Sequence, residues 1–152
     1  MKKIIIALAI VAASMTALSC DRYDDGRPPK VVRELFADMF PSAKDVEWEA
    51  EMGYWKVSFE TGTGASRVDS EAWYNEMGEW VRTETDRFPS SLPEEIKAII
   101  TSSEYASAMI DDVNYVQTPS EEYYQFELTV AGASIYINVY SDGRITPAKF
   151  EW

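Results

Sequence analysis

The sequence contains no histidine and only one cysteine, Cys20. Histidine is the commonest general base and zinc ligand, so its absence excludes Ser-His-Asp and Cys-His catalysis and Cys/His zinc sites. No glycine-rich phosphate loop of standard spacing occurs, and Asp142-Gly143 lacks the other ligands of a calcium loop. Paired carboxylates can hydrolyse glycosides, but 26 acidic residues always include some suitable pair. We therefore expect no enzymatic activity, no cofactor and no metal.

Basic residues are scarce, with 14 Lys and Arg against 26 Asp and Glu and a net charge of −12. They form no cluster, whereas nucleic-acid binding relies on clustered cations, so a nucleic-acid partner is not expected. Removing a leader that holds Lys2 and Lys3 leaves 12 basic residues against 26 acidic ones, a net charge of −14. This acidity fits a soluble surface, and it also fits the steering of a basic partner.

The N-terminus has the organisation of an export signal. Lys2 and Lys3 precede an uncharged apolar run over residues 4–13, and Leu18-Ser19-Cys20 follows. That ending resembles the lipobox of bacterial lipoproteins, in which the cysteine is lipidated and becomes the first residue. We predict a signal peptide over residues 1–19, lipid on Cys20 and a tether over residues 20–28. The alternative is ordinary cleavage with a free thiol, which is disfavoured because Cys20 has no partner for an intrachain disulfide.

The remainder of the chain resembles itself. Similar pieces recur in the same order about 65 to 70 positions apart, such as Val46-Glu47-Trp48 with Val113-Asn114-Tyr115. We predict two tandem units over residues 29–88 and 89–152, each a short helix on an antiparallel sheet of three or four strands. Small units bury too little surface to be secure alone, so the two are expected to share a sheet or an interface.

Each unit is predicted to begin with a helix that has one apolar stripe. Pro41 is expected to end the first helix, and Ser91 and Glu94 have the spacing of a capping box at the start of the second. The stripes are Val32, Leu35, Phe36, Met39 and Phe40, and Leu92, Ile96, Ile99 and Ile100.

The segments after each helix alternate with a period of two residues, which is typical of strands with one buried face. Turns with glycine, such as Met52-Gly53 and Met77-Gly78, separate them. The rows predicted to face the helices are Val46 and Trp48; Trp55, Val57 and Phe59; Val68, Ala72 and Tyr74; Tyr124, Phe126, Leu128 and Val130; and Ile135, Ile137 and Val139.

The opposite row mixes large amphipathic rings with charges, a composition found in binding hot spots. We predict that this face is free and that it binds a partner. An alternative is that the rings stabilise the sheet as cross-strand pairs or are covered by the other unit. The predicted partner-binding residues are Tyr54, Lys56, Arg67, Trp73, Trp80, Arg82, Tyr123, Tyr136 and Tyr140.

Four segments of the sequence carry a family resemblance, at residues 40–49, 53–59, 73–80 and 92–97. They resemble the putative β-lactamase-inhibitor-like, PepSY-like family of small exported proteins found in Bacteroides and its relatives. The resemblance implies an α+β fold of tandem helix-and-sheet units like that of β-lactamase inhibitory protein, whose concave sheet grips an enzyme. The paired disulfides of that inhibitor have no counterpart here, and none of its inhibitory loops matches residue by residue.

The expected function is that of an exported, lipid-anchored binding module that docks a protein or peptide, with inhibition of an exported enzyme as one option. The alternative is a structural or small-ligand-sensing envelope lipoprotein. We expect anchoring in the outer membrane, facing the periplasm. In these bacteria, acidic residues soon after the lipidated cysteine resemble a signal for display on the cell surface, which Asp21, Asp24 and Asp25 match loosely.

Overall fold

The computed structural model describes residues 22–23 and 26–148. The predicted signal peptide, Cys20 and the acidic residues that follow it lie outside this part of the chain. The elements in chain order are β1 (Arg22–Tyr23), α1 (Lys30–Met39), β2 (Lys44–Glu51), β3 (Tyr54–Thr61), η1 (Gly64–Ser66), β4 (Val68–Asn75), β5 (Trp80–Asp86), η2 (Pro89–Ser91), α2 (Glu94–Thr101), β6 (Met109–Gln117), β7 (Glu122–Val130), β8 (Ala133–Val139) and β9 (Ile145–Pro147).

All of these strands form one sheet in chain order, from β1 to β9. The short β1 lies parallel to β2, and each later strand is antiparallel to the one before it. β5 and β6 pair from Thr83 with Gln117 to Asp86 with Asn114, so the two halves of the chain share a single sheet. The predicted antiparallel α+β class is confirmed, whereas the duplication into two repeats stays a prediction.

Helix α1 forms because its apolar stripe has a core to cover. Val32 and Phe36 are buried, and the Phe36 ring centroid lies 5.3 Å from that of Trp48 and 5.1 Å from that of Phe59. The helix ends at Met39, before Phe40 and Pro41, as predicted. The first core cluster contains Val32, Phe36, Val46, Trp48, Val57, Phe59, Ala72 and Tyr74.

Helix α2 covers a second cluster through Ile96 and Ile100. The predicted capping box is wrong, because Pro93 is the N-cap residue and the Ser91 hydroxyl donates to the Phe88 carbonyl in the preceding 3-10 turn. Val130, predicted to lie in this core, is 39% exposed at the end of β7. The cluster contains Leu92, Ile96, Ile100, Val113, Phe126, Leu128, Ile137 and Val139.

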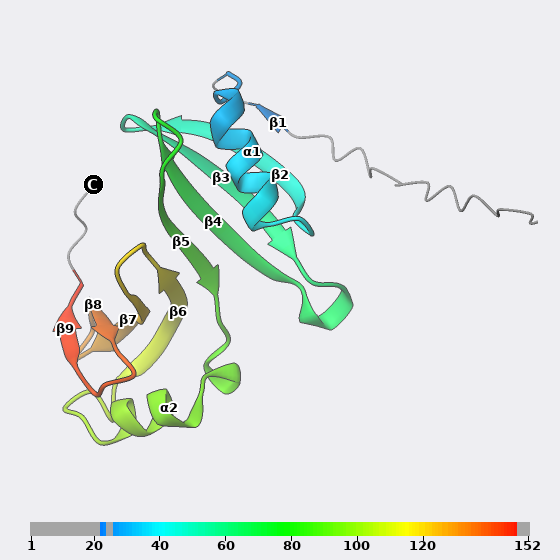
Figure 1. The fold of residues 1–152 in the computed structure, drawn as a ribbon. Coiled ribbons are helices and arrows are strands. Elements are labelled where there is room, and N and C mark those ends of the chain that lie inside the picture. The colour runs from blue at the N-terminus through cyan, green and yellow to red at the C-terminus, as the bar shows by residue number, and fades with distance from the viewer. Residues whose placement is uncertain (1–21, 24–25, 149–152) are drawn as a thin grey trace, which may run out of the picture.

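Both helices pack on the same face of the sheet. Directly paired residues in neighbouring strands direct their side chains to one face. Ala72 of the first cluster pairs with Thr83, and two residues later Thr85 pairs with Tyr115. Tyr115 pairs with Tyr124, which packs on the second cluster. Figure 1 shows α1 across β2–β4 and α2 beside β6–β8. We call the opposite side, which carries no helix, the open face.

The turn between β4 and β5 contacts α1. Gly78 has φ +86°, and a Cβ added there would lie 2.8 Å from the Val31 side chain. A larger residue at this position would therefore be strained and would push the turn away from the helix.

Within the described part of the chain, neither helix has the length and apolarity that a membrane span requires.

Candidate functional site

The open face holds seven of the nine predicted partner-binding residues. Lys56 pairs with Trp73, and Trp73 pairs with Arg82, which places these three side chains side by side. Tyr123 lies on the same face through its pairing with Val116, which also pairs with Glu84. The seven residues are Tyr54, Lys56, Trp73, Arg82, Tyr123, Tyr136 and Tyr140.

Trp80 lies on the helix-covered face, so its predicted exposure on the open face is wrong. The pairing between β4 and β5 is irregular, since Trp73 pairs with Arg82 while its neighbour Tyr74 pairs with Trp80. Val81 is the extra residue, and such a bulge reverses the parity of the strand. Trp80 packs on the first core cluster, and its indole N–H donates to Thr83 Oγ1 at 2.9 Å.

Arg67 lies at the rim of the open face, just before the first residue of β4. It follows the turn η1 between β3 and β4, where its side chain is exposed. Its Nε lies 3.3 Å from Glu60 Oε2, at the rim of the sheet. Arg67 also lines a hollow of this face with Asp69 and Phe88, so its role in binding stays a prediction.

Trp73 lies at the centre of the open face and is only 4% exposed, although no helix covers it. The Arg82 guanidinium lies over the indole ring at 4.2 Å from its centroid, and Arg82 Nη2 is 3.1 Å from Glu84 Oε1. Trp73 Nε1 also donates to Glu51 Oε2 at 3.4 Å. A stacked guanidinium over a partly desolvated ring stabilises both groups, so this centre is ordered without a partner.

Lys56 lies beside Trp73 among three glutamates. Its ammonium contacts Glu49 and lies 3.6 Å from a carboxylate oxygen of both Glu51 and Glu71. Desolvation lowers the pKa of Lys56, but the Glu49 hydrogen bond and the charges of the three carboxylates outweigh it, so the pKa is raised above 10.5. Lys56 thus neutralises carboxylates that would otherwise repel one another.

Replacing Lys56 with methionine is expected to lower the free energy of unfolding by about 1–2 kcal/mol at pH 7, because three carboxylates lose their shared cation. Lys56 has a raised pKa, so its contribution is complete below pH 10.5 and is lost as the pH rises through the folded value. Urea unfolding of the wild-type and variant proteins, at pH 7 and at a strongly alkaline pH, tests this. A difference that persists unchanged at strongly alkaline pH would contradict the electrostatic explanation.

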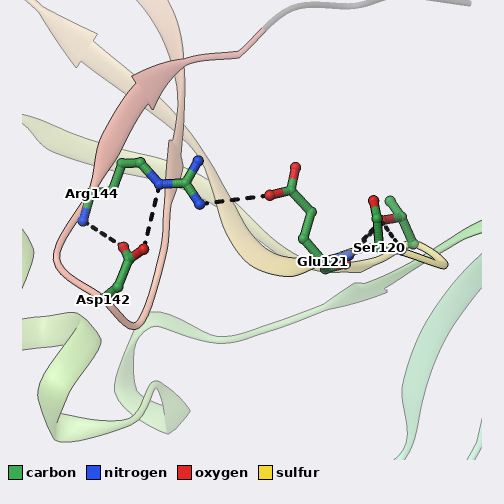
Figure 2. A network of polar contacts seen from close by, with 5 residues as sticks. Ser120, Glu121, Asp142 and Arg144 are labelled. Carbon is green, nitrogen blue, oxygen red and sulfur yellow. Dashed lines mark hydrogen bonds and ion pairs between the residues drawn. The ribbon is translucent and has the colours of Figure 1, made fainter.

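A second group of rings lies on the open face beyond Val116, which pairs with both Glu84 and Tyr123. The Tyr123 and Tyr140 centroids are 5.3 Å apart, and the Arg144 guanidinium lies 3.7 Å from the Tyr140 centroid. Figure 2 shows that Arg144 also joins two turns, with Nη2 3.6 Å from Glu121 Oε2 and Nε 3.5 Å from Asp142 Oδ2. Tyr140 is 7% exposed, so this ring too is covered by an arginine.

The sequence-based prediction of the site did not include Arg144 or Val116. Arg144 follows the Asp142-Gly143 turn and returns over Tyr140, a contact that strand parity does not predict. Val116 is completely buried on the open face, where its pairing partners are Glu84 and Tyr123. A complete parity count along β6 is the signal that places Val116 among these residues.

One end of the sheet has an acidic hollow of about 490 Å³. A second hollow of about 260 Å³ adjoins it and shares Asp69 and Asp86. Phe88, 69% exposed, lines the second hollow together with Arg67 and Arg87. The described residues contain no group of three acidic side chains arranged to hold a metal ion. The carboxylates of the first hollow are Asp45, Glu47, Glu60, Asp69, Glu71 and Asp86.

The arrangement offers ordered rings, fixed guanidinium groups and many carboxylates on a broad sheet surface. Such groups provide contacts for a macromolecule. Solved structures with the same fold come from Bacteroides. A BLIP-like protein from Bacteroides fragilis has a TM-score of 0.73 at 19% identity, covering 83% of this chain and 88% of its own.

Two further structures are similar. A DUF2874 family protein from Bacteroides ovatus has a TM-score of 0.71 at 22% identity, covering 80% of this chain and 89% of its own. A protein from Bacteroides eggerthii, described as a putative periplasmic protein, has a TM-score of 0.67 at 20% identity, covering 79% and 86%. No curated protein matches this sequence.

The sequence pattern of one protein family matches residues 53–145, which is more than half of the chain. The matched region runs from the turn before β3 to the first residue of β9 and includes most of the open face. The chain therefore belongs to the family described as "Putative beta-lactamase-inhibitor-like, PepSY-like".

Proposed function

We propose that this protein is an exported binding module that docks a protein or peptide on the open face of its sheet. One observation carries the proposal: the centre of a face without any helix is already packed and charge-paired, around Trp73, Arg82 and Glu84. Order of this kind before binding lowers the entropic cost of association. The inhibitor-like family and the BLIP-like neighbour support binding over catalysis.

The rings divide into two roles in this proposal. Trp73 and Tyr140 are buried beneath arginines and hold the face rigid. Tyr54 and Tyr123 are half-buried and Tyr136 is 37% exposed, so these tyrosines contact the partner. Tyrosine suits this role because it supplies a large contact area at a low entropic cost.

The proposal includes a lipid anchor on Cys20 in the outer membrane. The motif at Leu18-Ser19-Cys20 supports lipidation, and the structural neighbour described as periplasmic supports export. Residues 20–28 connect the lipid to the two units proposed over residues 29–88 and 89–152, although Arg22 and Tyr23 within them already pair with β2 in the sheet. A tether keeps the module at the membrane while leaving the open face free to meet its partner.

Photo-cross-linking in intact cells tests the docking face. The photoreactive residue p-benzoylphenylalanine at Tyr136 or Tyr54 is expected to form covalent adducts with another protein. The same residue at Ala37 of α1 or Ala98 of α2, both exposed on the helix side, is the matched control and is expected to form few adducts. Adducts that arise equally from both sides, or only from the helices, would refute docking on the open face.

A further inference from the structure

The open face carries a large excess of negative charge. Strand pairing places ten carboxylates and three cations on it between β2 and β8. Lys56 is already shared by three of these carboxylates, and Arg82 is paired with Glu84. Arg67, at the rim of the face, lies 3.3 Å from Glu60, so the carboxylates still outnumber the cations. The carboxylates are Glu47, Glu49, Glu51, Glu60, Asp69, Glu71, Glu84, Asp86, Asp112 and Glu127; the cations are Lys44, Lys56 and Arg82.

The shape of the face provides a place for side chains from a partner. The hollow of about 490 Å³ lies across β2, β3, β4 and the end of β5, and its volume is in the range of ligand pockets. Its neighbour adds the ring of Phe88, which is 69% exposed, and is lined by four aspartates and two arginines, namely Asp69, Asp86, Asp111, Asp112, Arg67 and Arg87. An exposed ring beside carboxylates is suited to a cation, because both the ring face and the carboxylates attract positive charge.

Two carboxylates of this region, Asp86 and Glu84, have raised pKa values. Burial is the largest cause of the raised pKa of Asp86, followed by the charges of Asp112, Asp69 and Glu71, and the charge of Arg87 opposes them. Glu84 also has a raised pKa, chiefly from burial, with Glu71 and Asp86 adding to it against Arg82. Around Asp86 the neighbouring carboxylates outweigh Arg87, so a positive group from outside would relieve the repulsion there.

We infer that the segment which docks on the open face is rich in lysine and arginine and inserts these side chains into the acidic hollow lined by Glu60, Asp69, Glu71 and Asp86. This inference rests on the proposed function and names the chemistry of the partner. A second copy of the chain is a poor occupant, since a symmetric contact would place carboxylates against carboxylates. Anionic lipid and nucleic acid are repelled for the same reason.

The test uses the purified protein with its anchor, in non-ionic detergent, titrated with an oligo-arginine peptide and an oligo-glutamate peptide. Oligo-arginine is expected to bind, with NMR shifts concentrated at the amides of Asp69, Glu71 and Asp86, and oligo-glutamate is not. The double variant Asp69→Asn/Asp86→Asn is expected to weaken binding about fivefold. The control Glu95→Gln/Glu104→Gln removes the same charge from exposed positions on the helix side and is expected to bind normally.

Equal weakening in both double variants would overturn the inference, because binding would then follow net charge alone. Shifts spread over the helices would do the same. Cross-linking from Tyr136 separates this inference from the proposed function. If adducts persist in Asp69→Asn/Asp86→Asn and their partner peptides lack lysine and arginine, docking stands and the cationic partner is refuted. If Tyr136 forms no adducts, docking itself fails.

Discussion

Replacing Trp48 with alanine is expected to lower the free energy of unfolding by about 3–5 kcal/mol, the typical cost of removing a buried tryptophan. Trp48 is 1% exposed and packs between α1 and the sheet, with its ring centroid 5.3 Å from Phe36 and 6.1 Å from Tyr74. The smaller side chain would leave a cavity beneath α1. Urea unfolding followed by circular dichroism measures the loss.

Trp48→Phe is the control for this substitution. The Trp48 indole N–H is buried, and no described residue accepts a hydrogen bond from it. Phenylalanine keeps much of the ring contact and removes this unsatisfied donor, so its cost is expected to be below about 1.5 kcal/mol. If Trp48→Ala and Trp48→Phe lowered the free energy of unfolding equally, the loss would not come from the cavity beneath α1.

Replacing Cys20 with serine is expected to move the protein from the membrane fraction to the soluble fraction. An acyl chain contributes about 0.8 kcal/mol of membrane affinity for each buried CH₂ group, and serine cannot form the thioether that carries the lipid. Cell fractionation with detection by antibody measures the change, and mass spectrometry of the purified wild-type protein identifies its first residue and the attached lipid.

Ser19→Ala is the matched control, because it keeps a small residue before the cysteine and is expected to stay in the membrane fraction. A Cys20→Ser protein that remains membrane-bound would contradict lipid anchoring. So would a mature wild-type protein that begins at another residue or carries a free thiol at Cys20.

The layout of the core follows from residue periodicity. The three- and four-residue steps of Val32 and Phe36 in α1, and of Ile96 and Ile100 in α2, locate the buried stripe of each helix. Alternation locates most of both core clusters, including Val57 and Phe126. These patterns predict the core correctly because burial of apolar area is the dominant favourable term in folding, and each helix or strand buries its apolar face along its length.

The errors occur where a single local event changes the parity or the burial. One extra residue, Val81, moves Trp80 to the helix-covered face. Position at a strand end leaves Val130 exposed. Arginines from nearby positions cover Trp73 and Tyr140, so rings predicted to be exposed are buried without any helix above them. The alternation of apolar and polar residues predicts the face to which a side chain points. It does not predict which arginine side chain will cover that face.

The measurement that tests the central claim most directly is the ratio of cross-linked adducts formed in living cells by p-benzoylphenylalanine at Tyr136 and at Ala98. Docking on the open face predicts a protein adduct from Tyr136 and almost none from Ala98. An equal yield from the two positions, or a larger yield from Ala98, would contradict it.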